Sequence, residues 1–403
     1  MEKWTPAFSY TAVDYNHDVV TYENISQTGV FRNNLKGDAV RLKLNNCYNP
    51  SEVRITHADF WLRNRVTGKK RGPFKVTLCG AEEIVLPAGE APFSDPAAAD
   101  VSPEDDFIVK MYFREKTSFW SVCTSYARRS WYAEEKKEDY RENDWTFPAD
   151  RKALSPMLGG DPYGMDFIVC LSEIQVRTHE KVTILGLMGD SVTAMSTYCD
   201  SLIDRLYRAY PGLVTVVNGG ISGNRINRGY PAVPASVFPG EGHQFGRAGK
   251  DRILDDLYQD FTPDILFILE GVNDCSHSLA FHEEPVETAE NIYAGLQEMI
   301  RKAKEQGSKV YLSTAAPFGG VGMGWREQGE PMRCRLNELI RQGTDADDLI
   351  DLDLIMRDPD DPHFMQEGMH LGDGVHPNYF GGEKIAEALF RRWFSENSGF
   401  PSE

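Results

Sequence analysis

Four short polar clusters in the second half of the chain combine residue types that acyl transfer requires. A serine hydroxyl is a weak nucleophile unless a base takes its proton, and histidine is the usual base because its pKa lies near neutrality. The clusters supply a serine, a histidine, a carboxylate and several amide donors. They are Gly189-Asp190-Ser191, Asn218-Gly219-Gly220-Ile221-Ser222-Gly223-Asn224, Glu270-Gly271-Val272-Asn273-Asp274 and Gly372-Asp373-Gly374-Val375-His376-Pro377-Asn378.

The candidate roles follow from the chemistry of each residue. Ser191 is the candidate nucleophile and His376 its base. Asp373 lies three residues before His376, so in a turn it can reach the ring nitrogen that faces away from the serine and hold the productive tautomer. A tetrahedral intermediate also needs hydrogen-bond donors for its oxyanion. The candidates are the backbone N–H of Ser191, that of Gly223 and the side-chain amide of Asn273.

Each cluster also has an ordinary structural explanation. The sequence Gly-Asp-Ser is common, Gly-Asn pairs usually form turns, and Asn-Asp after a strand often caps a helix. His277 and His370 are rival candidates for the base. The catalytic interpretation depends on the four clusters following one another in the right order at the ends of strands.

The second half of the chain alternates strands with amphipathic helices, which is typical of a parallel sheet covered on both faces. A buried run from residue 182 ends at the Gly189-Asp190-Ser191 turn. Loops after parallel strands meet at one edge of the sheet, so the clusters should form one site. The expected fold is α/β, a flavodoxin-like, doubly wound parallel sheet. Further strands are expected at residues 213–217, 265–269, 309–312 and 349–352, and helices at 198–210, 287–306, 333–341 and 382–394.

The first half shows short alternating runs separated by Gly and Pro, which favours an all-β sandwich of jelly-roll type in front of the α/β domain. With 403 residues the chain is long enough for two domains, expected at residues 1–177 and 178–403. Residues 133–162 are interpreted as a long surface excursion. The expected strands include residues 40–44, 74–78, 84–86, 107–113 and 165–174.

Two aromatic pairs in the first half have two interpretations. The pairs are Phe119-Trp120 and Trp131-Tyr132. A flat aromatic face can stack on the apolar face of a sugar ring, and it can equally pack inside the sandwich. A sandwich alone implies no function.

Charge and composition exclude several partners. A formal net charge of −18 provides no basic footprint for nucleic acid or for an anionic membrane surface. The first residues do not form a basic region followed by an apolar run, and no stretch has the length of a membrane span, so we expect a cytoplasmic protein. The seven cysteines form no Cys-x-x-Cys pair, which predicts reduced thiols and no metal site.

The four clusters resemble the blocks that define the SGNH (GDSL) hydrolases, and the resemblance covers residues 182–396. Glu270 before the third block, and an insertion with Phe245-Gly246-Arg247, resemble a branch of acylhydrolases associated with xylan breakdown. The first half resembles the β-domain of its two-domain members. That similarity comes through Leu86-Pro87-Ala88-Gly89, Ser94-Asp95-Pro96 and Thr124-Ser125-Tyr126.

The resemblance implies ester hydrolysis through an acyl-serine intermediate, with no metal and no cofactor. Five residues beside the blocks are candidates for substrate binding, although internal salt bridges explain Arg225 and Glu270, and also Arg247, at least as well. Asp190 is further expected to hold the turn before Ser191. The five residues are Asp190, Asn224, Arg225, Glu270 and Asp274.

The leading functional hypothesis is a carbohydrate esterase that removes acetyl groups from imported plant oligosaccharides. A lysophospholipase, thioesterase or aryl acylhydrolase is the alternative. An apolar acyl channel would be needed for a lipid substrate, and the insertion at residues 229–261, with its charges, prolines and glycines, does not resemble one. A third hypothesis is a carbohydrate-binding protein with an inactive hydrolase domain. The expected partner is a small-molecule or oligosaccharide ester, and the sequence leaves the oligomeric state open.

Overall fold

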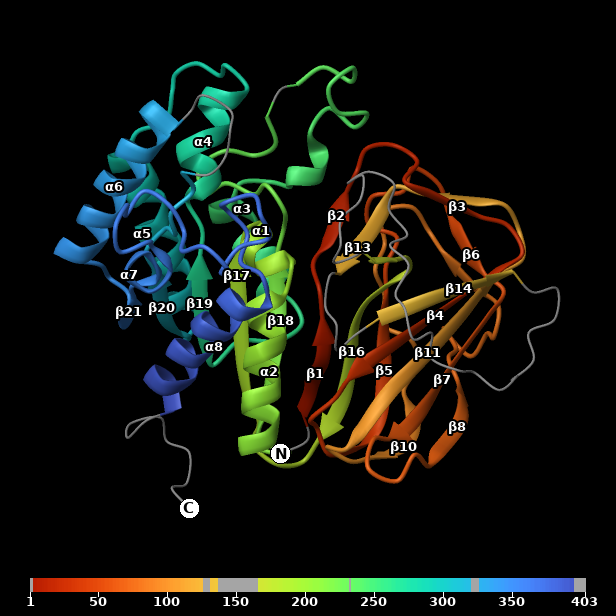
Figure 1. Cartoon of the computed structure of the whole chain (residues 1–403). Helices are drawn as coiled ribbons and strands as arrows, with labels where there is room; N and C mark the ends of the chain where they lie inside the picture. The colour runs from red at the N-terminus through yellow and green to blue at the C-terminus, as the bar shows by residue number, and fades with distance from the viewer. Residues whose placement is uncertain (1–2, 126–130, 137–165, 232, 320–325, 395–403) are drawn as a thin grey trace. The chain divides into compact units, whose positions relative to one another are not determined.

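The computed structural model describes residues 3–125, 131–136, 166–231, 233–319 and 326–394 (Figure 1). The chain packs into two compact units. The first unit comprises Met1–Val182 and Pro211–Val217, and the second comprises Thr183–Tyr210 and Asn218–Glu403. The first unit therefore takes in one short segment from later in the chain.

Antiparallel sheets form the first unit, as the alternating runs predict. The four-stranded sheet has the order β1 (Lys3–Ser9), β16 (Leu171–Thr178), β5 (Gly37–Leu44) and β10 (Ala97–Val101). The five-stranded sheet has the order β14 (Trp131–Lys136), β4 (Ile25–Arg32), β11 (Asp105–Phe113), β7 (His57–Asn64) and β8 (Lys70–Lys75). Smaller sheets pair β12 (Thr117–Phe119) with β3 (Val20–Tyr22), β6 (Val53–Ile55) with β9 (Ile84–Leu86), and β13 (Ser121–Ser125) with both β15 (Asp166–Ile168) and β2 (Ala12–Asp14).

Burial explains why these runs form strands. Every residue of β11 is buried, so this central strand is covered on both faces. In β5 the apolar residues are buried, while Arg41 and Lys43 are partly exposed, as the alternation predicts. Phe119 is fully buried and its ring packs against Tyr22 and Phe113, so the interior interpretation of this aromatic residue is correct.

Three expectations for the first half change. The strand expected at residues 165–174 is two strands, β15 and β16, because Cys170 between them has a left-handed φ of 58°. The strand expected at residues 74–78 ends at Lys75. The excursion expected from residue 133 starts later, because β14 continues to Lys136; residues 137–162 and the side chains of Trp131 and Tyr132 lie outside what the structure describes. The jelly-roll topology stays a prediction.

A five-stranded sheet forms the centre of the second half of the chain. Its order is β18 (Val214–Gly220), β17 (Thr183–Gly189), β19 (Ile265–Leu269), β20 (Lys309–Ser313) and β21 (Asp348–Ile350). The pairs β17–β19, β19–β20 and β20–β21 are parallel, which confirms the predicted parallel sheet. When these five strands are numbered by their order along the chain, their order across the sheet is 2-1-3-4-5, which is the flavodoxin-like arrangement.

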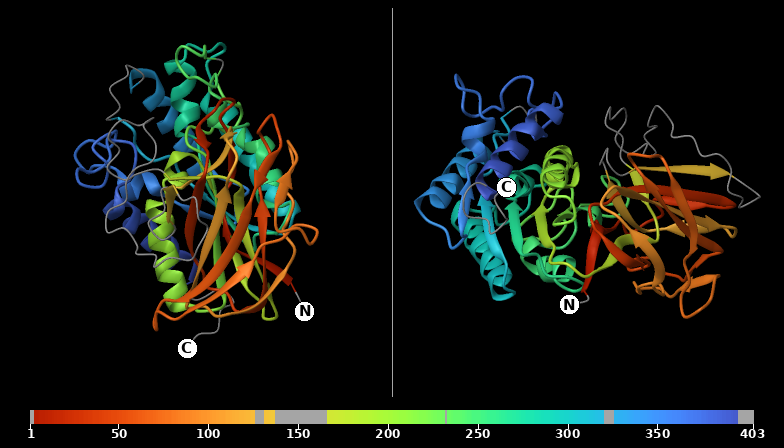
Figure 2. Two further views of the ribbon diagram at one scale, coloured as in Figure 1. Left: turned by 90° about the vertical axis from the view of Figure 1, so that its right-hand side faces the viewer. Right: turned by 90° about the horizontal axis from the view of Figure 1, so that it is seen from below.

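The helices of the second unit form two groups. The helix α2 (Thr197–Ala209) packs against α8 (Tyr379–Phe394), while α5 (Ala289–Glu305) packs against α3 (Gly249–Leu257) and α6 (Arg326–Gln342). Figure 2 gives two further views of these helices and the sheet. Alternating strands and amphipathic helices produce this layered packing.

Shorter elements complete the second unit. They are α1 (Ser191–Ala194), the 3₁₀ turn η1 (His243–Phe245), α4 (Val272–Ala280) and α7 (Leu352–Met356). The fifth strand, expected at residues 349–352, ends at Ile350, because Asp351 caps α7 by accepting a hydrogen bond from the backbone N–H of Leu354. The last residue of the expected strand, Leu352, is therefore the first residue of a short helix, which the apolar pattern of the sequence did not indicate.

Candidate active site

The turn that presents Ser191 is shaped by its two preceding residues. A Cβ atom on Gly189 would lie 2.0 Å from Oγ1 of Thr193, so a glycine is required there. Asp190 is the N-cap of α1, and its side chain accepts a hydrogen bond of 2.9 Å from the backbone N–H of Val192. Ser191 is therefore held as the first residue of α1, directly after β17, where its side chain is only half-buried.

Asp190 has the structural role expected from the sequence, since its side chain is buried and holds the turn. Burial raises the pKa of Asp190 to about 6, against the opposing effects of the Val192 amide and the positive charges of His376 and Arg252. The Asp190 carboxyl group thus holds the turn from a buried position, and this burial disfavours the ionised form of the group.

The structure brings Ser191, His376 and Asp373 into one chain of hydrogen bonds. Nε2 of His376 lies 2.7 Å from Oγ of Ser191, and Nδ1 of His376 lies 2.6 Å from Oδ2 of Asp373. An imidazole in this position can take the hydroxyl proton while the carboxylate stabilises the imidazolium that forms. The geometry is that of a serine nucleophile with an oriented base.

Asp373 is fixed by its own loop. Its Oδ1 accepts hydrogen bonds of 3.0 Å from the backbone N–H groups of Val375 and His376. Burial acts to raise the pKa of Asp373, but the hydrogen bond to His376 and the charge of His376 outweigh it and hold the pKa well below its usual range. Asp373 is therefore ionised at neutral pH and can orient the ring.

His370, a rival candidate for the base, has a different task. Its Nδ1 accepts hydrogen bonds of 3.0 Å and 3.1 Å from the backbone N–H groups of Gly372 and Gly374. The ring therefore braces the turn that contains Asp373. The sequence did not reveal this role, because a histidine close to a candidate triad is first considered as an alternative catalytic base.

Two candidate oxyanion donors lie after the neighbouring strands. Gly223 has a φ of 77°, and a Cβ atom there would lie 1.9 Å from Cδ1 of Phe245, so both backbone conformation and space require glycine. Asn273 lies in the first turn of α4, and its Nδ2 donates a hydrogen bond of 3.0 Å to the carbonyl oxygen of Asn224. This bond uses one amide hydrogen and fixes the direction of the other.

Four further candidate substrate-binding residues are buried and have partners inside the second unit. The amide of Asn224 donates to the carbonyl oxygens of Phe245 and Arg247. Arg225 pairs with Glu283, and Asp274 accepts hydrogen bonds from the backbone N–H groups of Ile226 and Asn227. Glu270 pairs with Arg252. These side chains, and that of Asp190, therefore have partners within the protein, and substrate contact by Asp190, Asn224, Arg225, Glu270 and Asp274 stays a prediction.

Ion pairs account for the charged residues whose role the sequence left open. Arg225 pairs with Glu283, Arg247 with Asp255, and Glu270 with Arg252. The internal salt-bridge interpretation is confirmed for Arg225 and Glu270, whereas the pair of Arg247 with Asp255 is exposed.

Arg252 is the residue of this region that the sequence did not reveal. Its guanidinium is 1% exposed and makes five hydrogen bonds, which matches its five N–H donors. The acceptors are the carbonyl oxygens of Gly189 and Gly219, Oδ1 of Asn224, and the carboxylates of Asp256 and Glu270. One side chain of α3 therefore ties together the ends of β17, β18 and β19 beneath the candidate site. An arginine on the buried stripe of α3, beside Ile253, was the available signal.

An aromatic cluster borders Gly223. Phe245 contacts the rings of Phe238 and Phe281, at centroid distances of 5.3 Å and 6.3 Å, and the ring of His277 at 5.4 Å. Burial, together with the charge of Arg225, lowers the pKa of His277 to about 3, so this second rival base is neutral. The half-buried ring of His277 therefore belongs to this aromatic cluster, in contact with Phe245 and Phe281.

Within the described ranges, every helix is too short or too polar to cross a membrane.

Several solved structures resemble about half of the chain. An acetyl xylan esterase is 21% identical over 52% of this chain and 98% of its own, with a TM-score of 0.37. A catalytic mutant of an acetylxylan esterase from Geobacillus stearothermophilus is 20% identical over 55% and 97%, with a TM-score of 0.38. The lipase/acylhydrolase from Enterococcus faecalis is 19% identical over 53% and 95%, with a TM-score of 0.36. Among curated proteins, none matches this sequence.

A family model identifies the region that holds the candidate site. Residues 187–383 match the GDSL-like Lipase/Acylhydrolase family. The matched region contains Ser191, Gly223, Asn273, Asp373 and His376. That part of the chain therefore belongs to the GDSL-like lipase/acylhydrolase family.

Proposed function

We propose that the second unit is a serine esterase that removes acetyl or other short acyl groups from carbohydrates. The observation that carries the proposal is the hydrogen-bond chain from Ser191 through His376 to Asp373, with distances of 2.7 Å and 2.6 Å. Such a chain activates a hydroxyl for attack on an ester carbonyl.

In the proposed reaction, Nε2 of His376 takes the proton of Ser191 as Oγ attacks the carbonyl carbon. The N–H groups of Ser191 and Gly223 and the second amide hydrogen of Asn273 stabilise the oxyanion. As the bond from the acyl carbon to the sugar oxygen breaks, His376 protonates that oxygen, so the sugar leaves with a hydroxyl group and an acyl-serine remains. Water, deprotonated by the same ring, releases the carboxylic acid and restores Ser191.

The aromatic cluster supports a short acyl group. The ring of Phe245 lies directly against Gly223, and the rings of Phe238, Phe281 and His277 pack around it. These rings fill the space beside the proposed oxyanion donor, where a long acyl chain would need an open channel. They therefore favour acetyl esters over the lipid and thioester alternatives.

A second aromatic pair supports a sugar as the alcohol part. Tyr230 is 42% exposed and stacks on the ring of His243 at a centroid distance of 3.8 Å. His243 begins the turn η1, which ends at Phe245 beside Gly223. An exposed ring with fixed orientation near the site offers a flat face to a sugar ring.

The test is acetate release from a panel of acetylated xylo- and manno-oligosaccharides by the full chain, with Ser191→Ala as the inactive variant. Ser236→Ala is the matched control, because Ser236 is exposed. We expect the control to release acetate at the wild-type rate, and aryl esters to be cleaved more slowly beyond propionate. If the wild type cleaves long-chain aryl esters best, the lipid alternative is correct. If a fluorophosphonate does not label Ser191, the inactive-domain alternative returns.

A further inference from the structure

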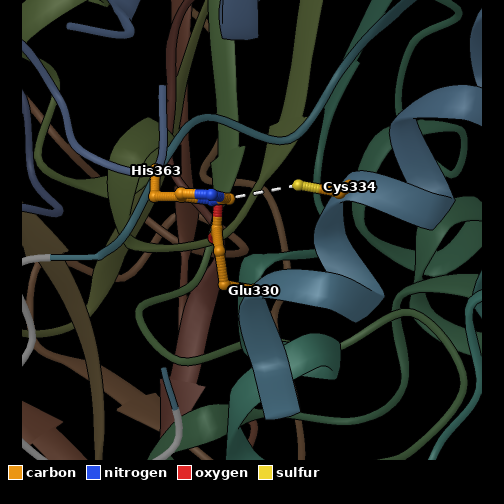
Figure 3. A group of neighbouring side chains, drawn as sticks. All are labelled: Glu330, Cys334 and His363. Carbon is orange, nitrogen blue, oxygen red and sulfur yellow. Dashed lines mark hydrogen bonds and ion pairs between the residues drawn. The ribbon is translucent and has the colours of Figure 1, made fainter. Parts of the chain in front are cut away.

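Three metal-ligating side chains meet at a place that the proposed reaction does not use. Glu330 and Cys334 lie one turn apart on α6, and His363 approaches them from the segment after α7 (Figure 3). One ligand atom from each side chain lies within 4.8 Å of the other two. Glu330 is buried and Cys334 partly buried, while the His363 side chain is 48% exposed, so an ion can enter from solvent.

The spacing of these atoms fits tetrahedral zinc. Nδ1 of His363 lies 3.1 Å from Oε1 of Glu330, and Sγ of Cys334 lies 3.8 Å from the same oxygen. Bonds to zinc of about 2.0 Å for oxygen and nitrogen and about 2.3 Å for sulfur give tetrahedral edges of roughly 3.3 Å and 3.5 Å. These two distances therefore differ from the tetrahedral values by a few tenths of an ångström, and the third lies within 4.8 Å.

We infer that Glu330, Cys334 and His363 bind a zinc ion, with water as the fourth ligand. The ion takes the place now occupied by hydrogen bonds directed at Oε1 of Glu330. The thiol of Cys334 releases its proton to solvent as the sulfur–zinc bond forms. His363 binds the ion through Nδ1, so in the complex its ring proton lies on Nε2.

Arg333 is the main opposing group, because its guanidinium already bonds both carboxylate oxygens of Glu330. It also donates to Oδ1 of Asp353 at 2.8 Å and to the carbonyl oxygen of Ala315 at 3.0 Å. The carboxylate of Glu330 and the thiolate of Cys334 would balance the charge of zinc, while Arg333 keeps Asp353, a carboxylate that also pairs with Arg341 and Arg357. Arg333 weakens the site by repulsion but orients the carboxylate that serves it.

A zinc ion here would crosslink two segments of the chain and so have a structural role. It would join α6 to the segment that contains His363, which continues into the loop of Asp373 and His376. Arg333 already makes a weaker connection, through a hydrogen bond of 3.4 Å to the carbonyl oxygen of Pro362. None of the three ligands belongs to the proposed catalytic set, so the ion should stabilise the fold and leave the chemical step metal-free.

The experiment uses the full chain, stripped with a chelator and titrated with zinc alone by calorimetry. We expect one zinc per chain, release of about one proton per ion from the thiol, and a higher Tm on addition of zinc. Titration with cobalt should give the near-ultraviolet charge-transfer absorption of a thiolate ligand. Cys334→Ser and His363→Gln should weaken zinc binding at least tenfold.

The controls separate this site from other thiols and from the esterase activity. Cys79→Ser removes an exposed free cysteine and should leave zinc binding and the cobalt absorption unchanged. Circular dichroism checks that each variant is folded. Absence of stoichiometric zinc binding in the wild type, or equal binding by folded Cys334→Ser, would overturn the inference and leave only the Arg333–Glu330 ion pair. Neither outcome depends on which ester the protein cleaves.

Discussion

The side-chain amide of Asn273 donates a hydrogen bond of 3.0 Å to the carbonyl oxygen of Asn224. Asn224 is itself held by Arg252, whose Nε lies 2.7 Å from Oδ1 of Asn224. The candidate oxyanion donor is therefore oriented before substrate arrives. Preorganised donors of this kind lower the barrier because nothing has to reorient during the reaction.

Asn273→Ala should lower kcat by about 100- to 1000-fold, because removal of one oxyanion donor typically costs that much. KM should change little if the donor acts mainly in the transition state. Steady-state kinetics on an activated acetyl ester measure both constants. Asn291→Ala, an exposed substitution on α5, is the control. A raised KM with unchanged kcat would show that Asn273 only binds substrate.

Asp373→Asn should reduce kcat/KM by about three to four orders of magnitude, because an amide does not hold the tautomer that makes Nε2 of His376 basic. Thermal denaturation should change little, because the Asp373 side chain is 42% exposed. The two measurements together separate a loss of orientation from a loss of folding. A decrease of less than tenfold in kcat/KM would contradict the role assigned to Asp373.

Arg252→Met should lower the free energy of unfolding by about 3–5 kcal/mol, because it leaves buried carboxylates and carbonyl groups without their donor. It should also lower kcat when the rate is divided by the number of active sites that react with a fluorophosphonate. The reason is that Arg252 is a common hydrogen-bond partner at the ends of three strands, and its loss leaves the site less well positioned. Urea denaturation and active-site titration measure the two effects. Arg301→Met removes an exposed pair with Glu305 and should cost less than about 1 kcal/mol. Full kcat per reactive site in Arg252→Met would limit Arg252 to a role in stability.

Asp274→Asn should reduce the fall in the free energy of unfolding that the wild type shows as the pH rises. Burial raises the pKa of Asp274 from 3.8 to about 7, despite the opposing backbone N–H groups of Ile226 and Asn227. Between these values the folded protein keeps a proton that the unfolded chain releases, so this contribution to stability is complete below pH 4 and is lost as the pH rises to 7. From pH 5 to pH 8 the wild type should lose up to about 3 kcal/mol more than the variant.

The measurement is urea denaturation of both proteins at pH 5 and pH 8. Asp190 and Glu270 also have pKa values raised by burial, so the wild type and the variant share part of the decline. Only the difference between them reports on Asp274. Equal declines in the two proteins would mean that Asp274 is ionised in the folded state at pH 5.

Periodicity and order along the chain were enough to predict the α/β layer and the residues that meet at its edge. The run that ends at Gly189 lies in β17, and the strand predicted at residues 265–269 has the bounds of β19. Both strands consist of residues buried on both faces, which gives a strong pattern in sequence. Convergence of the four clusters followed from the geometry of parallel strands.

The residues that support the site could not be predicted, because their roles depend on contacts distant in sequence. Asn224 and Glu270 carry polar groups that suit a ligand, yet both are held by Arg252 from another helix. Cys334 was judged by its distance from other cysteines, whereas its neighbours in space are Glu330 and His363. Spacing along the chain reveals local turns and caps, but not which buried charges neutralise one another.

The acid and the base of the proposed triad share one loop, which is closed by a bridge between His370 and Pro377 and braced by the ring of His370. Ser191 lies on a separate element, as the first residue of α1. A movement of that loop would thus carry the His376–Asp373 pair intact and lengthen only the distance to the serine. The imidazole would then stay oriented by Asp373 while Ser191 lost its proton acceptor.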